Sequence, residues 1–168
     1  MVGIDPGLTR CGFAVVDAIK GSHVQARALG AFTTSAQMEL PNRLASLQRD
    51  VRELLDEFSP DAVAIEKVFF QVNVKTAMSV GQASGVALAE AASSGCIVAQ
   101  YTPNEVKMSI AGYGGADKQQ VQRMVQQRLG LSAPPQPADA ADAAALALCY
   151  LATSPLTAAV HAALEGRS

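Results

Sequence analysis

The sequence predicts an α/β protein in which a five-stranded mixed sheet is flanked by helices on both faces. Two observations lead to this fold class. Three runs of strand-forming residues open the chain, and the links between them are so short that neighbouring strands are expected to run antiparallel. From residue 40 onward, helix-like and strand-like segments alternate, which is typical of parallel strands connected by helices.

The first three strands are predicted over residues 1–5, 11–16 and 24–33. Gly7 allows the chain to turn sharply between the first two. Apolar residues then recur every three or four positions from Leu40 to Phe58, which predicts an amphipathic helix that Ser59-Pro60 ends; the apolar positions are Leu40, Leu44, Leu47, Val51, Leu54, Leu55 and Phe58.

A fourth strand is predicted over residues 62–66, followed by a polar and aromatic stretch over 67–73. Small residues dominate the next helix, over 74–94, and a fifth strand follows over 97–101. These segments complete the alternation of strand and helix on which the fold class depends.

Capping residues mark the beginnings of the later helices. Thr102-Pro103-Asn104-Glu105 opens one helix with a hydroxyl at the N-cap and an acid three positions on. Asp117 caps another helix that runs to Leu129 and ends at Gly130. Three prolines exclude a helix over 132–137, and an alanine-rich helix is predicted over 139–153.

Composition bounds the size and the setting of the protein. At 168 residues, 49% of them apolar, the chain is long enough for one buried core and short for two, so we expect a single domain over residues 1–155 and a frayed tail over 156–168. Cys11, Cys96 and Cys149 are odd in number and show no CxxC spacing, which indicates reduced core residues of a cytoplasmic protein. No apolar run approaches the roughly 20 residues of a membrane span, so no membrane association is expected.

Four acidic residues stand where a metal site for phosphodiester cleavage would need them. Asp5 and Glu66 end two predicted strands, although continued burial would predict apolar side chains there. Unpaired carboxylates in such places are costly to remove from water and usually coordinate something. Asp139 and Asp142 open the last helix and lie three residues apart, hence on one helix face.

Carboxylates without histidine suit Mg²⁺ or Mn²⁺ better than zinc, because these hard cations prefer oxygen ligands. The two histidines, His23 and His161, are far in sequence from the acids. A pair of such ions about 3.5–4 Å apart can make water nucleophilic and stabilise a leaving oxyanion. We therefore predict Mg²⁺ or Mn²⁺, two ions per site, on the four acids.

Each acid also has a purely structural interpretation. Asp139 could be an N-cap, and Asp142 could be a first-turn acid favoured by the helix dipole. Asp5 could be a turn residue before Pro6-Gly7. Glu66 has the weakest structural explanation, because a glutamate at a strand end has no local backbone role. The presence of all four favours the metal site.

The layout of acids at the ends of the first and fourth strands and on a late helix is that of a ribonuclease H-like fold. Lys107 and Lys118 are, by their spacing alone, ordinary solvated helix lysines. Phe69 and Phe70 are either core residues or aromatics that stack on bases. The formal charge of −2 and the pI of about 5.6 give no sign of a nucleic-acid binder, which is typically basic.

Motifs along nearly the whole chain closely resemble the RuvC family of bacterial Holliday-junction resolvases. They are Gly3-Ile4-Asp5-Pro6-Gly7, Ala64-Ile65-Glu66-Lys67-Val68-Phe69, Asn73, Gly81-Gln82-Ala83-Ser84-Gly85-Val86, Val106-Lys107, Lys118 and Ala138-Asp139-Ala140-Ala141-Asp142-Ala143.

The resemblance implies a metal-dependent endodeoxyribonuclease that cuts four-way DNA junctions, with Asp5, Glu66, Asp139 and Asp142 as its catalytic carboxylates. It implies that Lys107 and Lys118 work near the scissile strand. It also implies that Phe69 reaches into the junction and that the surrounding segment, with Phe70 and Asn73, contacts DNA. A homodimer through helix 74–94 and a partnership with the RuvA–RuvB branch-migration complex are further implications.

Two other functions compete with this interpretation. Actin-like ATPases and sugar kinases also carry a Gly-Ile-Asp-x-Gly hairpin, but their architecture needs two such domains and this chain is long enough for one. A junction-binding module that kept the fold and lost catalysis would not need the intact set of four acids. The sequence therefore favours the nuclease.

Overall fold

The computed structural model describes residues 1–19, 23–68 and 74–154. Within these ranges the strands are β1 (Val2–Asp5), β2 (Arg10–Ile19), β3 (His23–Thr33), β4 (Ala62–Glu66) and β5 (Ile97–Tyr101). The helices are α1 (Leu40–Phe58), α2 (Val74–Ser93), α3 (Pro103–Ala111), α4 (Lys118–Arg128) and α5 (Ala138–Thr153). The predicted tail over 156–168 and the predicted DNA contacts Phe69, Phe70 and Asn73 lie outside the described residues.

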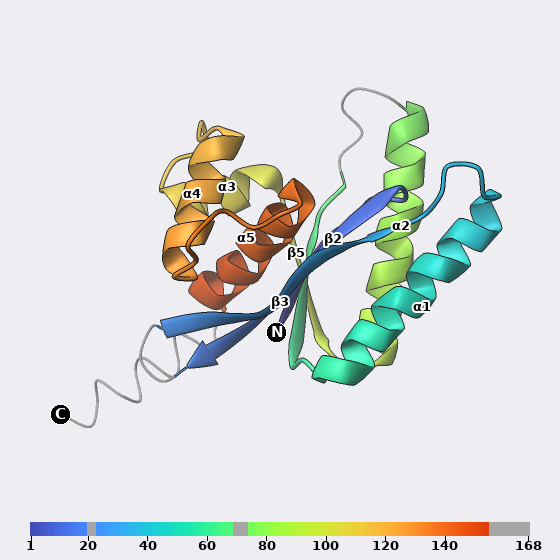
Figure 1. Ribbon diagram of the computed structural model, residues 1–168, viewed down its shortest axis with the longest axis horizontal. Coiled ribbons are helices and arrows are strands. Elements are labelled where there is room, and N and C mark those ends of the chain that lie inside the picture. Colours follow the sequence, from blue (N-terminus) through green and yellow to red (C-terminus); the bar gives the residue numbers. More distant parts are fainter. Residues whose placement is uncertain (20–22, 69–73, 155–168) are drawn as a thin grey trace.

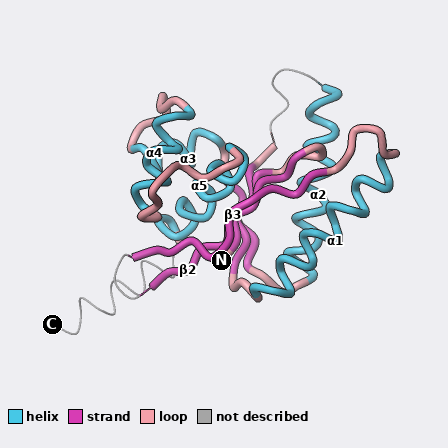
Figure 2. Tube along the Cα trace, viewed as in Figure 1, coloured by secondary structure: helices cyan, strands magenta, loops and turns pink. Residues whose placement is uncertain are grey.

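The strands form one mixed sheet (Figure 2), in which their order is β3-β2-β1-β4-β5. The first three strands pair antiparallel, and β4 runs parallel to both β1 and β5. The predicted mixed sheet is therefore confirmed. Strand β2 is longer than the predicted 11–16, because its pairing with β3 continues from Arg10 to Ile19.

Two helical layers cover the two faces of the sheet. Helices α1 and α2 lie on one side, and α3, α4 and α5 lie on the other (Figure 1). Strand residues divide between these layers by alternation: Ile4 and Ile65 pack into the core on the α1 and α2 side, whereas Ala14 and Ala64 pack with α5. By the same alternation, the side chains of Asp5 and Glu66 belong to the α5 face.

The alanine-rich helix α5 lies directly on the backbone of the sheet. A Cβ atom added to Gly3 would lie far inside van der Waals distance of the Ala143 carbonyl oxygen. One added to Gly12 would collide in the same way with the carbonyl oxygen of Asp139. Alanines fill most of the buried positions of α5, so the helix has little bulk to hold it away from these glycines.

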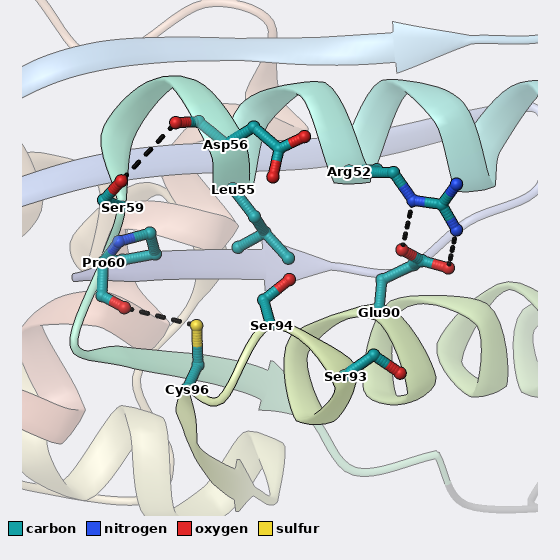
Figure 3. Close-up of a pocket in the computed structure, with 9 residues that line it drawn as sticks. All are labelled: Arg52, Leu55, Asp56, Ser59, Pro60, Glu90, Ser93, Ser94 and Cys96. Atoms are coloured by element: carbon teal, nitrogen blue, oxygen red, sulfur yellow. Dashed lines mark hydrogen bonds and ion pairs between the residues drawn. The ribbon is translucent and has the colours of Figure 1, made fainter.

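Helices α1 and α2 are joined on the opposite face by a buried acid. Glu90 is 6% exposed and accepts two hydrogen bonds of 2.9 Å from Arg52 (Figure 3). Gln48 donates a third, of 2.6 Å, to the same carboxylate. The pocket beside this pair is bordered by Pro60 and Cys96, which precede β4 and β5, so it lies at the end of the sheet opposite to Glu66.

The predicted helix ends follow local chemistry. Thr102 and Asp117 each cap a helix through a reciprocal capping box, with Glu105 and Gln120 respectively. Helix α1 ends at Ser59, which takes a left-handed conformation with φ of 41°. None of the described helices is long and apolar enough to cross a membrane.

The contact between Gly12 and α5 leads to a stability prediction. Gly12→Ala should lower the free energy of unfolding by about 1–3 kcal/mol, because the new methyl group must push the first turn of α5 away from the sheet. Chemical denaturation would measure the loss. Gly115→Ala is the matched control, since its added Cβ would meet Tyr113 only at an ordinary 3.6 Å. Equal stabilities of the two variants would contradict the proposed packing constraint.

Candidate active site

Three elements bring the four predicted acids to one end of the sheet. Asp5 and Glu66 are the last residues of β1 and β4, which are parallel neighbours with Ile4 paired to Ile65. The first turn of α5 lies over Gly12, which pairs with Asp5 across the sheet. That turn carries Asp139, and Asp142 follows on the same helix face.

The turn that leads from Asp5 into β2 is held by hydrogen bonds. The buried Thr34 side chain donates to the Leu8 carbonyl at 2.5 Å. Arg43 donates to the hydroxyl oxygens of both Thr34 and Thr9, at 2.9 and 2.8 Å. The end of β1 and the start of β2 therefore keep a defined position relative to α1.

Crowding of carboxylates dominates the electrostatics of the site. Burial, together with the negative charges of Glu66 and Asp142, raises the pKa of Asp5 to about 8. The protonated Asp5 side chain donates a hydrogen bond to Glu66. Burial likewise raises the pKa of Glu66, although this hydrogen bond opposes the change.

Two cationic side chains border the acids. Lys118 Nζ lies 2.6 Å from Asp142 Oδ2, and this hydrogen bond raises the pKa of the lysine. Arg10 Nη1 lies 3.2 Å from Asp139 Oδ2. Lys118 is the first residue of α4, where the Asp117 capping box sets the position of the helix start. The two cations thus engage the two α5 acids, while Asp5 and Glu66 engage each other.

The structural interpretation of Asp139 and Asp142 as capping or first-turn acids is wrong in part. Helix α5 begins at Ala138 with Pro137 at its N-cap position, and no side chain caps it. Asp139 lies in the first turn, where the helix dipole does favour an acid, but its carboxylate pairs with Arg10. Asp142 lies beyond the first turn and pairs with Lys118.

The predicted role of Lys107 stays a prediction. Lys107 lies half-buried on α3, and the ion pairs found in the described part of the chain do not include it. Conversely, our sequence reasoning missed Arg10. The sequence held no sufficient signal, because Arg10 lies outside the predicted strand 11–16 and only the structure shows that Arg10 and Gly12 face the α5 layer.

The donor set fits a hard divalent cation. Four carboxylates face one region, and the pKa of Asp5 is raised by burial and by neighbouring negative charge that a bound cation would offset. Within the described ranges, however, no three acidic, histidine or cysteine side chains already stand at the spacing of ligands around one ion. Instead, Asp139 Oδ2 and Asp142 Oδ2 accept hydrogen bonds from Arg10 and Lys118, so a cation that binds these oxygens competes with the two side chains.

Solved structures with a similar fold identify the class of the protein. RuvC from Thermus thermophilus, in complex with a Holliday junction substrate, matches with a TM-score of 0.87 and 37% identity, over 93% of this chain and 96% of that chain. The yeast mitochondrial Holliday junction resolvase shares the fold alone, with a TM-score of 0.64 and 14% identity over 90% of this chain and 78% of that chain. The fold is ribonuclease H-like.

Sequence comparison then identifies the family. The model described as "Crossover junction endodeoxyribonuclease RuvC" matches residues 1–150. A RuvC from Thermobifida fusca is 52% identical over 151 residues, which are 90% of this chain and 83% of that protein. The chain belongs to the RuvC family of crossover junction endodeoxyribonucleases. Nucleases of this family are metal-dependent.

The raised pKa of Asp5 predicts how the stability of the metal-free protein depends on pH. The folded chain holds a proton that an unfolded aspartate, with its pKa near 3.9, releases, so stability falls as the pH rises from about 4 to about 8. Asp5→Asn removes this dependence. Its melting temperature in EDTA should therefore exceed that of the unmodified chain by a margin that grows between pH 5 and pH 8.

Asp17→Asn is the control, because Asp17 belongs to an exposed ion pair with Arg27 on the same hairpin. It should show no comparable margin. If the melting temperatures of Asp5→Asn and the unmodified chain differ by the same amount from pH 5 to pH 8, the shared proton is contradicted.

Proposed function

We propose that this protein is a structure-selective endodeoxyribonuclease that resolves four-way DNA junctions by paired symmetric nicks, in homologous recombination and DNA repair. The observation that carries the proposal is the convergence of Asp5, Glu66, Asp139 and Asp142 at one end of the sheet in a member of the RuvC family. The similar Thermus thermophilus protein was solved with a Holliday junction substrate.

The four carboxylates are proposed to hold two Mg²⁺ or Mn²⁺ ions per site. When bound, the ions supply a nucleophilic water and stabilise the leaving oxyanion of phosphodiester hydrolysis. The chain's own contribution begins with Asp5 and Glu66, which share a proton at their facing oxygens in the metal-free protein. Ionisation of this pair supplies the negative charge that attracts the cations, at a site where burial keeps their attraction strong.

Cationic side chains are proposed to stabilise the negative charge of the cleaved strand. Lys118 already lies among the acids, and a cation there favours the charge that grows on the phosphate in the transition state. Lys107 on α3 is proposed to act from the same layer of the molecule. On the basis of the sequence motifs, we propose that DNA near the centre of the junction is contacted by Phe69, Phe70 and Asn73.

A non-catalytic junction-binding module is the alternative from a different class. The site opposes it, because a protein that only binds DNA gains nothing from a carboxyl group whose pKa is raised by burial and by acidic neighbours, and negative charge repels phosphate. The actin-like ATPase interpretation is not favoured either, since the RuvC family model covers residues 1–150.

Neutralising single acids tests the proposed site. Asp5→Asn, Glu66→Gln and Asp142→Asn should each reduce cleavage of a synthetic four-way junction in Mg²⁺ by about 100-fold or more, because each removes a metal ligand. Junction affinity in a gel-shift assay should stay equal or rise, since a charge that repels phosphate is lost.

Asp17→Asn serves again as the matched control and should cleave normally, because Asp17 lies outside the acidic group. Near-normal nicking by any of the three site variants would remove that residue from the proposed catalytic set. Loss of junction affinity together with cleavage would instead point to a folding defect.

The active unit is proposed to be a homodimer with α2 at its interface. The four-way junction has approximate two-fold symmetry, and two matched nicks need one active site per cut strand. On α2, Gly81 and Gly85 have no atom within 4 Å of an added Cβ, so this strip is open in the single chain. Ser84, which belongs to the same motif, is buried and so does not belong to this open strip.

Within the cell, we place this dimer in the cytoplasm, with residues 1–155 working as one nuclease domain. The RuvA–RuvB branch-migration complex is the proposed partner, on the strength of the family alone.

A bulky residue on the open strip tests the interface. Gly85→Leu should shift the protein from dimer to monomer in light scattering and uncouple the paired nicks, because the helices could no longer approach closely. Glu57→Leu adds the same side chain to an exposed position of α1 and is the control. A Gly85→Leu protein that dimerises as tightly as Glu57→Leu would show that the interface lies elsewhere.

A further inference from the structure

Arg10 occupies a place that neither the motifs nor the family assignment explains. It is the first residue of β2, directly after the turn that follows Asp5. Arg10 faces the α5 layer together with Gly12, the residue on which the first turn of α5 lies. Its guanidinium therefore meets Asp139 at 3.2 Å, while 56% of the side chain remains exposed to solvent.

This ion pair conflicts with the use of Asp139 as a metal ligand. The Asp139 oxygen that accepts from Arg10 would be needed by a cation, or would at least lie beside it. An arginine close to a bound divalent ion is repelled by it, whereas a DNA phosphate offers the guanidinium a two-pronged acceptor. Arg10 thus has one partner in the metal-free protein and a better one when DNA and metal are both present.

We propose that Arg10 holds Asp139 in the metal-free protein and moves to a backbone phosphate of the DNA when a divalent ion takes Asp139. This proposal rests on the proposed metal site. Arg10 then has two partners, Asp139 and a DNA phosphate, that it cannot bind at the same time. Metal binding and DNA binding therefore become cooperative through Arg10. By thermodynamic linkage, each ligand must then raise the affinity for the other by the same factor.

A comparison within the same hairpin separates this role from that of an ordinary surface ion pair. Arg27 pairs with Asp17 at 2.9 Å, and its side chain is also 56% exposed. Asp17 lies seven residues beyond Arg10 on β2, which corresponds to roughly 23 Å along an extended strand. Arg27 therefore matches Arg10 in chemistry and exposure but lies far from the acids, so Arg27→Ala is the control.

The first measurement is Mn²⁺ affinity without DNA, read as free Mn²⁺ by electron paramagnetic resonance. Arg10→Ala should bind Mn²⁺ about two- to five-fold more tightly than the unmodified chain, because no ion pair has to be broken first. Arg27→Ala should bind as the unmodified chain does. Unchanged or weaker Mn²⁺ binding by Arg10→Ala would overturn the proposal.

The second measurement is the salt dependence of junction affinity in Mn²⁺, with phosphorothioate linkages around the crossover to slow cleavage. Arg10→Ala should reduce the slope of log affinity against log salt by about one, the loss of a single phosphate contact. Arg10→Lys should keep most of the slope, because it retains the charge. The same slope for Arg10→Ala and Arg27→Ala would also overturn the proposal.

Two further controls keep the outcome interpretable. Thermal melting in EDTA should show that Arg10→Ala folds, and Arg10→Gln replaces it in both measurements if it does not. Mn²⁺ binding by Asp5→Asn tests the metal site separately. If Asp5→Asn loses Mn²⁺ binding and Arg10→Ala behaves as Arg27→Ala, the site stands and the Arg10 proposal fails; if Asp5→Asn binds Mn²⁺ normally, the site itself is wrong.

Discussion

The direct contact of helix α5 with the backbone of the sheet is the constraint on which the site depends. Gly3 and Gly12 leave no Cβ atom between the strands and the helix, and alanine covers most of the buried surface of α5. This close approach places Asp139 over β2 at Gly12, the residue that pairs with Asp5. Because backbone meets backbone, the relative position of the acids does not depend on flexible side chains, which is what a site with narrow geometric tolerance requires.

The same close packing brings four negative charges together, and neighbouring groups compensate their repulsion. Four carboxylates at one sheet end repel one another, and the structure relieves the repulsion by a proton shared between Asp5 and Glu66 and by cations on the two α5 acids. In the proposed function, a bound cation displaces the shared proton and Arg10, whereas Lys118 stays beside the acids. The metal-free arrangement therefore combines closely packed backbone with side-chain partners that compensate the charge of the acids.

Local rules explain why much of the fold was predictable. The capping boxes at Thr102 and Asp117 involve residues three positions apart, so short-range chemistry decides where α3 and α4 begin. The period of apolar residues predicts α1 for the same reason. The length of β2 was not predictable in this way, because residues Asp17 to Ile19 become strand only by pairing with β3. The sequence also suggested that an aspartate caps α5, but the N-cap position is occupied by Pro137 and no side chain caps the helix.

By itself, the sequence determined the order of strands and helices, the mixed sheet, and the four acids as candidates for a metal site. The physical reason is that alternation, capping and the cost of a carboxylate at a strand end are properties of neighbouring residues. Only the tertiary structure decided that Asp5 shares a proton with Glu66, that Lys118 joins the acids, and that Arg10 faces Asp139, 129 residues away in the chain. These partners are distant in sequence: the parallel pairing of β1 and β4 brings Asp5 to Glu66, and the close packing of α5 on Gly12 brings Asp139 to Arg10.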